Sequence, residues 1–336
     1  MACRYDQCVP EPEACTQTAQ CGGDSYCDTS SGECLPWGMG PGGSYDEQCA
    51  VELFPQAYFP TIQCKWDAGA PGDPFPSHAN VIGTPVVADF SRAGADAPWL
   101  VFTSYNCTDG GSAACRGDDV ACTAVIRVVD GATCGLIRSI SAPVPIASST
   151  PALADLNDDG VPEIVAAKAG GGLAAWRYSA ESGFEIFFDS TSDYGVGVCN
   201  WAGPSIHDLN NDGSPEILLH AGVFDASGAA MDVSLDAAVL STGYFPVVAD
   251  VDIDGKPELL TAKVSYQLDL NDEWVVDTQS DTPAGNVAVG DFGTFPVNGA
   301  NDNRAVLDGI AEIVVVGEGE VLIMNHLRRV LMQVSI

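Results

Sequence analysis

Three segments of the chain repeat one acidic pattern, D-x-[ND]-x-D-G-x-P-E, in which carboxylate and amide side chains alternate with other residues. When the backbone curls, the oxygens at positions 1, 3 and 5 converge on one point, and glycine at position 6 permits the sharp turn. The carbonyl of position 7 and the carboxylate of position 9 complete a shell of hard oxygens, which selects Ca²⁺ over softer metals. We therefore predict three Ca²⁺ sites, whose ligand residues are Asp155, Asn157, Asp159, Val161 and Glu163; Asp208, Asn210, Asp212, Ser214 and Glu216; and Asp250, Asp252, Asp254, Lys256 and Glu258.

These loops differ from the EF-hand, whose closing glutamate stands at position 12. Here position 12 holds Ala166, Leu219 and Thr261, and the flanking segments have the composition of strands. The alternative interpretation is an aspartate-rich turn that binds nothing. Three matches in register between similar apolar flanks favour metal sites, because so many acidic and amide groups within nine residues would repel one another without a cation.

Two further copies of the pattern are incomplete. Asp89 is followed by serine and alanine where ligands would stand, so we expect no metal in that copy. Asp291 is separated by an insertion from Asp308 and Glu312, which would close the loop. The metal site of this last copy is therefore left open.

The leading aspartates of the five copies define a repeat along the chain. They are 66, 53, 42 and 41 residues apart, in the order Asp89, Asp155, Asp208, Asp250 and Asp291. A period in the forties is typical of a four-stranded propeller blade, and short apolar runs without helical periodicity agree with strands. We predict an all-β fold, a β-propeller of four-stranded blades, in which the five repeats close a ring or belong to a larger one. Residues 62–69 are expected to add an outer strand to a neighbouring blade.

Cysteines are concentrated at the beginning of the chain, where seven of the 13 lie within the first 49 residues. This density in a short segment poor in hydrophobic residues indicates a disulfide framework formed in an oxidising compartment. A zinc site is the weaker interpretation, since the segment has neither a C-x-x-C pair nor histidine. We divide the chain into a disulfide-rich module at residues 1–34, a Gly/Pro linker at residues 35–49 and a propeller at residues 50–336.

Four cysteines in the first repeat are expected to pin a long loop, with pairing inside this set as one option: Cys107, Cys115, Cys122 and Cys134. The loop carries an Arg-Gly-Asp tripeptide at residues 116–118, which a receptor could recognise. We interpret the tripeptide as a chance occurrence.

The net charge of −33 restricts the partners that the protein can have. Such a surface repels nucleic acids and anionic membranes and attracts cations. We find no stretch of about 18 apolar residues that would span a membrane. The chain has no visible signal peptide, and for a disulfide-rich, calcium-binding chain this indicates an incomplete N-terminus. We predict an extracellular or cell-surface location. One interpretation is that the chain is part of a longer surface protein.

The repeats resemble the FG-GAP or VCBS repeats of integrin-alpha-like β-propellers. GNVAVGDF at residues 285–292 resembles the start of such a repeat, and DLNDDGVPEI at residues 155–164 resembles the calcium loop. The resemblance implies a propeller of about seven blades with Ca²⁺ between the first two strands of a blade. It also implies roles in adhesion, in carbohydrate or protein binding, or in scaffolding beside an enzyme domain. The chain departs from the family by closing its loops with glutamate and by lacking the Gly-Ala-Pro tripeptide that follows them.

From these features we predict a non-catalytic binding or adhesion module, stabilised by Ca²⁺, that recognises a glycan or a protein. One alternative is the propeller scaffold of a secreted polysaccharide lyase or glycoside hydrolase, and another is a purely structural part of a longer surface protein. The sequence contains no G-x-S-x-G motif and no G-x-x-x-x-G-K-[ST] phosphate loop. With 13 basic residues, a cluster of basic groups and carboxylates suited to catalysis is not evident.

Overall fold

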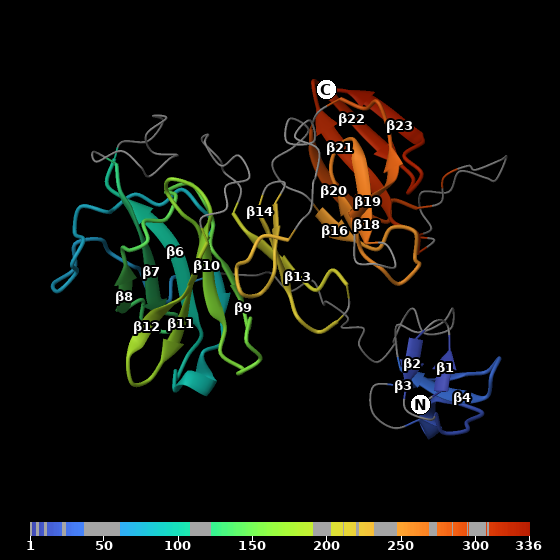
Figure 1. The fold of residues 1–336 in the computed structure, drawn as a ribbon, viewed down its shortest axis with the longest axis horizontal. Coiled ribbons are helices and arrows are strands. Elements are labelled where there is room, and N and C mark those ends of the chain that lie inside the picture. The colour runs from blue at the N-terminus through green and yellow to red at the C-terminus, as the bar shows by residue number, and fades with distance from the viewer. Residues whose placement is uncertain are drawn as a thin grey trace. The chain divides into compact units, whose positions relative to one another are not determined.

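A computed structural model describes residues 2–4, 7–9, 12–21, 25–36, 61–107, 122–190, 203–210, 212–219, 222–231, 247–268, 274–283, 285–293, 295, 307 and 309–336. The chain divides into two compact units, Met1–Thr61 and Ile62–Ile336. Most of the strands of both units are labelled in Figure 1. The part of the chain that is described includes no helix long and apolar enough to cross a membrane.

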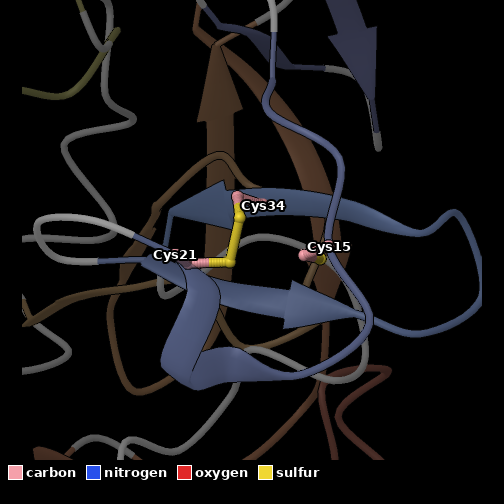
Figure 2. A group of neighbouring side chains, drawn as sticks. All are labelled: Cys15, Cys21 and Cys34. Carbon is pink, nitrogen blue, oxygen red and sulfur yellow. A yellow bond between two sulfur atoms is a disulfide. The ribbon is translucent and has the colours of Figure 1, made fainter.

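The first unit is a small β structure held by disulfides. It consists of two hairpins and one 3₁₀ turn: β1 (Ala2–Arg4) with β2 (Gln7–Val9), β3 (Ser25–Asp28) with β4 (Glu33–Pro36), and η1 (Thr18–Gln20). Disulfides join Cys15 to Cys27 and Cys21 to Cys34, and Figure 2 shows the bond between the latter two. Leu35 is fully buried, so a minimal core supports the cross-links. The predicted disulfide framework is confirmed for these four cysteines.

Among its described residues, the second unit contains five antiparallel sheets, which we call blades one to five in chain order; blade three has three described strands and the other blades have four. The strands of each blade are neighbours in sequence and pair in sequence order. Their bounds are β5 (Val86–Ala88), β6 (Trp99–Tyr105), β7 (Ala124–Asp130) and β8 (Leu136–Ile140) in blade one; β9 (Ala152–Ala154), β10 (Glu163–Ala167), β11 (Leu173–Ser179) and β12 (Gly183–Asp189) in blade two; β13 (Ser205–His207), β14 (Glu216–Leu219) and β15 (Gly222–Phe224) in blade three; β16 (Val247–Ala249), β17 (Glu258–Leu260), β18 (Val264–Leu268) and β19 (Trp274–Gln279) in blade four; and β20 (Asn286–Gly290), β21 (Glu312–Gly317), β22 (Glu320–Met324) and β23 (Val330–Ser335) in blade five. The predicted all-β fold with four-stranded blades is confirmed.

Consecutive blades pack through cores that follow from the alternation of side chains along the second strand of each blade. The closing glutamate is position 9 of the acidic pattern. The next residue, position 10, packs into the core shared with the preceding blade, and position 11 packs into the core shared with the following blade. Ile164 thus belongs to the core between blades one and two, and Val165 to the core between blades two and three. The same division holds for Ile217 and Leu218 in blade three and for Leu259 and Leu260 in blade four. The period of two therefore gives the second strand of blades two, three and four the same orientation relative to the neighbouring blades.

The opposite face of blade one is covered by the segment that precedes it. Arg127 of β7 is fully buried, and its Nη1 donates a 2.6 Å hydrogen bond to Oδ1 of Asp73 while Nη2 donates to the carbonyl of Phe75 at 2.8 Å. The ring of Trp66 packs edge-on against Phe102 and lies 5.6 Å from the Arg127 guanidinium carbon. Residues 62–69 form turns and irregular backbone, so the predicted outer strand is wrong. Side-chain contacts hold residues 62–75 of the segment, and Asn80 near its end forms an antiparallel backbone bridge with Tyr105 of β6.

The disulfides of blade one correct a second expectation. Cys107 pairs with Cys122, which agrees with pairing inside the set of four cysteines. Cys134 instead pairs with Cys64, which lies outside that set. Cys134 lies in the turn between β7 and β8, where the preceding segment crosses blade one. Cys115 and the Arg-Gly-Asp tripeptide at residues 116–118 lie outside the described residues.

Candidate metal centre

The acidic loops connect the first two strands of blades two, three and four, and we call them loop 1 (residues 155–163), loop 2 (residues 208–216) and loop 3 (residues 250–258). In loop 3 the backbone N–H of Asp254 donates to Oδ1 of Asp250 at 3.1 Å, and the N–H of Gly255 donates to Oδ2 of Asp250 at 3.0 Å. Gly255 has φ +88°, a conformation that favours glycine. The first aspartate therefore organises the turn with both carboxylate oxygens.

Loops 1 and 2 repeat this hydrogen-bond pattern. Oδ1 of Asp155 accepts the N–H of Asp159, and Oδ1 of Asp208 accepts the N–H of Asp212, both at 3.1 Å. The glycine N–H at position 6 again donates to Oδ2 of the first aspartate in each loop. Position 3 also contributes, because Oδ1 of Asn157, Asn210 and Asp252 accepts the N–H of position 5. The side chains of positions 1 and 3 therefore both meet the backbone of position 5 in all three loops.

The residues at position 7 contact the loop through their backbone. The N–H groups of Val161, Ser214 and Lys256 donate to Oδ1 of the aspartate at position 5, at 2.7 to 2.8 Å. The ligand that we predict from these residues is their carbonyl oxygen, and this role stays a prediction.

The closing glutamate begins the second strand of each blade and is buried: Glu163 and Glu258 have exposed fractions of 0% and Glu216 of 5%. Oε2 of each glutamate accepts the N–H of position 2 at 2.8 Å, from Leu156, Leu209 and Val251. In loop 1 the other oxygen accepts Nδ2 of Asn157 at 3.0 Å. Each glutamate thus ties the loop to the strand with one oxygen, and the second oxygen of Glu163 and of Glu258 is directed into the loop.

Loop 3 has the densest negative charge. Carboxylate oxygens of Asp250, Asp252, Asp254 and Glu258 all lie within 4.8 Å of one another. Burial, with repulsion from Asp252, Asp250 and Asp254 adding to it, raises the pKa of Glu258 to about 7. Nε2 of Gln267 in β18 donates to Oδ2 of Asp254 at 2.8 Å and to Oε1 of Glu258 at 3.1 Å. One amide thus meets two of four converging carboxylates, and a divalent cation would compensate the remaining charge.

The other two closing glutamates have a similar electrostatic environment. Burial, reinforced by Asp159 and Asp155, raises the pKa of Glu163 to about 7. Burial also raises the pKa of Glu216, and Asp212 and Asp208 add to the effect. In both loops asparagine replaces the position 3 carboxylate of loop 3, so each has one fewer negative charge among its ligand residues.

Blade five contains the same framework, which the sequence left open. Oδ2 of Asp291 accepts the N–H of Gly309 at 2.8 Å, and Oε2 of Glu312 accepts the N–H of Phe292 at 2.8 Å. Gly309 has φ +79°, like the glycine of the complete loops. The insertion therefore leaves the two ends of the loop in place. The spacing from Gly309 to Glu312, which equals that from Gly160 to Glu163, was the available signal.

Blade one lacks the closing carboxylate. Ala88 pairs with Trp99, whereas the corresponding Ala154 of blade two pairs with Glu163. The carboxylate of Asp89 instead accepts the N–H and hydroxyl of Ser91, at 2.8 and 2.9 Å. An aromatic side chain at the closing position gives a physical reason for our expectation that this copy holds no metal.

A second group of potential ligands, the sulfurs of Cys15, Cys21 and Cys34, lies within 4.8 Å in the first unit (Figure 2). Cys21 and Cys34 are bonded to each other, and Cys15 is bonded to Cys27. Metal binding requires thiolates, so the disulfide interpretation holds for this group.

With this geometry described, the chain can be compared with known proteins. Residues 155–219 match the family of FG-GAP-like repeats. This FG-GAP-like repeat begins at the first aspartate of loop 1 and ends with β14, so it includes loops 1 and 2. None of the curated proteins matches the sequence.

The fold is similar to that of a solved structure. The biofilm matrix protein Bap1 of V. cholerae matches with a TM-score of 0.58 and 19% identity, over 82% of this chain and 42% of that chain. The chain therefore spans less than half the length of Bap1. A rhamnogalacturonan lyase, PL11, of Bacillus licheniformis matches over 76% of this chain and 60% of that chain, with 14% identity and a TM-score of 0.33, too low to support any argument.

Proposed function

We propose that loops 1, 2 and 3 bind Ca²⁺ and that the ions stabilise the blades. The observation that carries the proposal is the convergence of Asp250, Asp252, Asp254 and Glu258 within 4.8 Å. Their donors are hard carboxylate oxygens, which suit Ca²⁺, and FG-GAP-like repeats resemble known calcium loops. In loops 1 and 2 the side-chain oxygens of Asn157 and Asn210 take the place of the Asp252 carboxylate.

The ions would act on folding more than on chemistry. Each closing glutamate is buried, and two of them have a pKa raised to about 7, so the metal-free loop contains charge that burial disfavours. Ca²⁺ bound to the ionised loop offsets this cost, and its binding free energy adds to the stability of the folded state. Because each loop links the first two strands of a blade, the ion also fixes the register of that blade.

We propose further that the protein is an extracellular binding or adhesion module without catalytic activity, which recognises a glycan or a protein. Disulfides in both units support an oxidising compartment. The fold resembles that of Bap1, a biofilm matrix protein, which supports a role in an extracellular matrix. The net charge of −33 favours neutral or cationic ligands over polyanions.

A thermal melt with Ca²⁺ titration tests the metal proposal. Melting temperatures are measured in EDTA, Mg²⁺ and Ca²⁺ for the wild type and for Asp159→Ala, Asp212→Ala and Asp254→Ala. We expect a rise specific to Ca²⁺ that each substitution reduces. Equal melting temperatures in EDTA and Ca²⁺ for the wild type would show that the loops are turns without metal.

A binding screen tests the second part of the proposal. The Ca²⁺-loaded protein is applied to an array of neutral and acidic polysaccharides, with the EDTA-treated protein as the control. We expect Ca²⁺-dependent retention on at least one neutral glycan. Depolymerisation of a bound polysaccharide, followed by reducing-end or unsaturated-product assays, would contradict the non-catalytic assignment.

A further inference from the structure

One of the acidic loops has a neighbour that the others lack. The space that a Cβ atom would occupy on Gly160 is filled by the side chain of Arg92, with its Cδ, Cζ and Nη1 atoms. The equivalent glycines Gly213, Gly255 and Gly309 have nothing within 4 Å of that position. A guanidinium group therefore rests directly on loop 1 and on no other described loop.

The incomplete loop of blade one holds Arg92 in this place. Arg92 lies in the 3₁₀ turn η3 (Ser91–Ala93), which begins after Asp89 and is tied to its carboxylate through Ser91. Ala93, like Val161 of loop 1, packs against the core between blades one and two. The turn is thus anchored at both sides of Arg92, and only the arginine side chain extends over Gly160.

The contact brings a positive charge beside the proposed ligands. Gly160 donates its N–H to Oδ2 of Asp155, and the next residue donates to Oδ1 of Asp159. None of the ion pairs found among the described residues involves Arg92. Its guanidinium lies against Gly160, beside the loop, without an ion pair to any described carboxylate.

We propose that Arg92 lowers the Ca²⁺ affinity of loop 1, so that the incomplete loop of blade one tunes the metal site of blade two. The inference rests on the proposed Ca²⁺ function of the loops. A fixed monovalent cation repels an incoming divalent one, and the repulsion is partly screened by solvent and salt. For charges several ångströms apart near the surface, removal of Arg92 is expected to tighten Ca²⁺ binding roughly threefold to tenfold at low ionic strength.

Isothermal titration calorimetry on a chain with only loop 1 intact tests the proposal. In the Asp212→Ala, Asp254→Ala background, the Ca²⁺ dissociation constant is compared with and without Arg92→Gln. Both chains are measured at about 0.1 M and at about 1 M salt, between which the Debye length falls from about 10 Å to about 3 Å. The neutral glutamine keeps most of the side chain's length. We expect the Arg92→Gln chain to bind more tightly, and the difference to shrink at high salt. Asp158, a further charge in loop 1, is present in both chains and cancels.

A control isolates the contact from net charge. Arg138→Gln removes an exposed arginine of β8, which lies in none of the acidic loops. In the loop 1 background it is expected to change the dissociation constant by less than twofold. If the background does not fold, Ca²⁺ binding is measured by competition with a chelator on the chain with all three loops intact. There the weakest of the Ca²⁺ dissociation constants is expected to fall by the same factor in Arg92→Gln.

The possible results separate this inference from the proposed function. Absence of Ca²⁺ binding to all three loops of the wild type would overturn the proposed function itself. Binding by the loops with an unchanged or weaker affinity in Arg92→Gln would overturn only the role of Arg92. An equal gain in Arg138→Gln would also overturn it, because the effect would then follow from net charge.

Discussion

Trp99 stacks on Phe90 in blade one, with ring centroids 4.6 Å apart and planes inclined by 20°. Trp99 occupies the position that the closing glutamate has in blades two to five. Phe90 occupies the position whose N–H donates to that glutamate in the other blades, namely that of Leu156, Leu209, Val251 and Phe292. An aromatic pair has therefore replaced a carboxylate that receives a backbone hydrogen bond. The aromatic pair takes the place of a predicted metal ligand and supplies apolar contact between blades one and two, where both rings are buried.

Truncation of this aromatic pair should destabilise the second unit without affecting Ca²⁺ binding. Trp99→Ala is expected to lower the free energy of unfolding by about 3 to 5 kcal/mol, through lost burial and the cavity that remains. Urea unfolding in saturating Ca²⁺ and in EDTA measures the loss, which should be the same in both. Trp99→Phe, which keeps an aromatic ring, should lose clearly less. A loss confined to the Ca²⁺ sample would show that blade one takes part in metal binding.

The repeat and its loops were predictable because they depend on residues close together in sequence. Asp250 and Glu258 lie eight residues apart, and the intervening glycine at positive φ decides how the chain returns. The period of two along the following strand then places Leu259 and Leu260 in different cores. Local spacing was therefore sufficient for blade architecture and for the framework of the loops.

Contacts between distant residues were not predictable from spacing. Asp73 meets Arg127, and Cys64 meets Cys134, only because the segment before blade one crosses its outer face. Neither pair has a local pattern that distinguishes it from other acidic, basic or cysteine residues. The contact of Arg92 with Gly160 depends in the same way on the packing of two blades.

The raised pKa values of the closing glutamates predict how metal-free stability changes with pH. Burial raises the pKa of Glu163 and Glu258 from 4.5 to about 7, so the folded chain holds their protons more tightly than the unfolded chain. Their contribution is therefore complete below about pH 4.5 and is lost as the pH rises through about 7, with an upper limit of about 3 kcal/mol for each group. In EDTA the melting temperature should fall between pH 5 and pH 8 (roughly the window that these values define).

Calcium should reverse this trend, because it binds the ionised carboxylates. The difference in melting temperature between Ca²⁺ and EDTA is expected to grow as the pH rises over the same window. Glu258→Gln removes one titrating group and should flatten the EDTA profile while reducing the response to Ca²⁺. If the melting temperature in EDTA rose with pH over this window, the raised pKa values of Glu163 and Glu258 would be contradicted.

Alanine at two equivalent glycines should reveal the contact with Arg92. Gly255→Ala introduces a Cβ at φ +88° into open space, so its cost should be only the conformational one, roughly 1 to 2 kcal/mol. Gly160→Ala carries the same cost at φ +82° and must also displace Arg92. Urea unfolding in EDTA should therefore show a larger loss for Gly160→Ala. In an Arg92→Ala background the losses caused by Gly160→Ala and Gly255→Ala should become equal. A difference that persists would show that a neighbour other than Arg92 causes it.

Arg328 is expected to be essential to the packing of blade five on blade four. The side chain extends from the turn between β22 and β23, is 4% exposed, and donates from Nη1 to the carbonyl of Ala262 at 2.9 Å and from Nη2 to that of Thr261 at 2.8 Å. Its Nε donates to the hydroxyl of Ser265 at 3.0 Å. Burial lowers the pKa of Arg328 to about 10, so the group is still charged at pH 7. A buried cation is thus held by oxygen acceptors of the neighbouring blade.

Arg328→Met keeps the apolar length of the side chain and removes the donor to the carbonyl of Thr261 and to the hydroxyl of Ser265, whereas the carbonyl of Ala262 still accepts the hydroxyl of Thr282 at 2.7 Å. The loss should be roughly 2 to 4 kcal/mol, because buried polar groups left unsatisfied bear their full desolvation cost. The neighbouring Arg329 is exposed, so Arg329→Met is the matched control and should change stability by less than about 0.5 kcal/mol. Urea unfolding gives both values, and hydrogen exchange of β21 and β22 should quicken only in Arg328→Met. Equal effects of the two substitutions would show that the turn does not hold blade five against blade four.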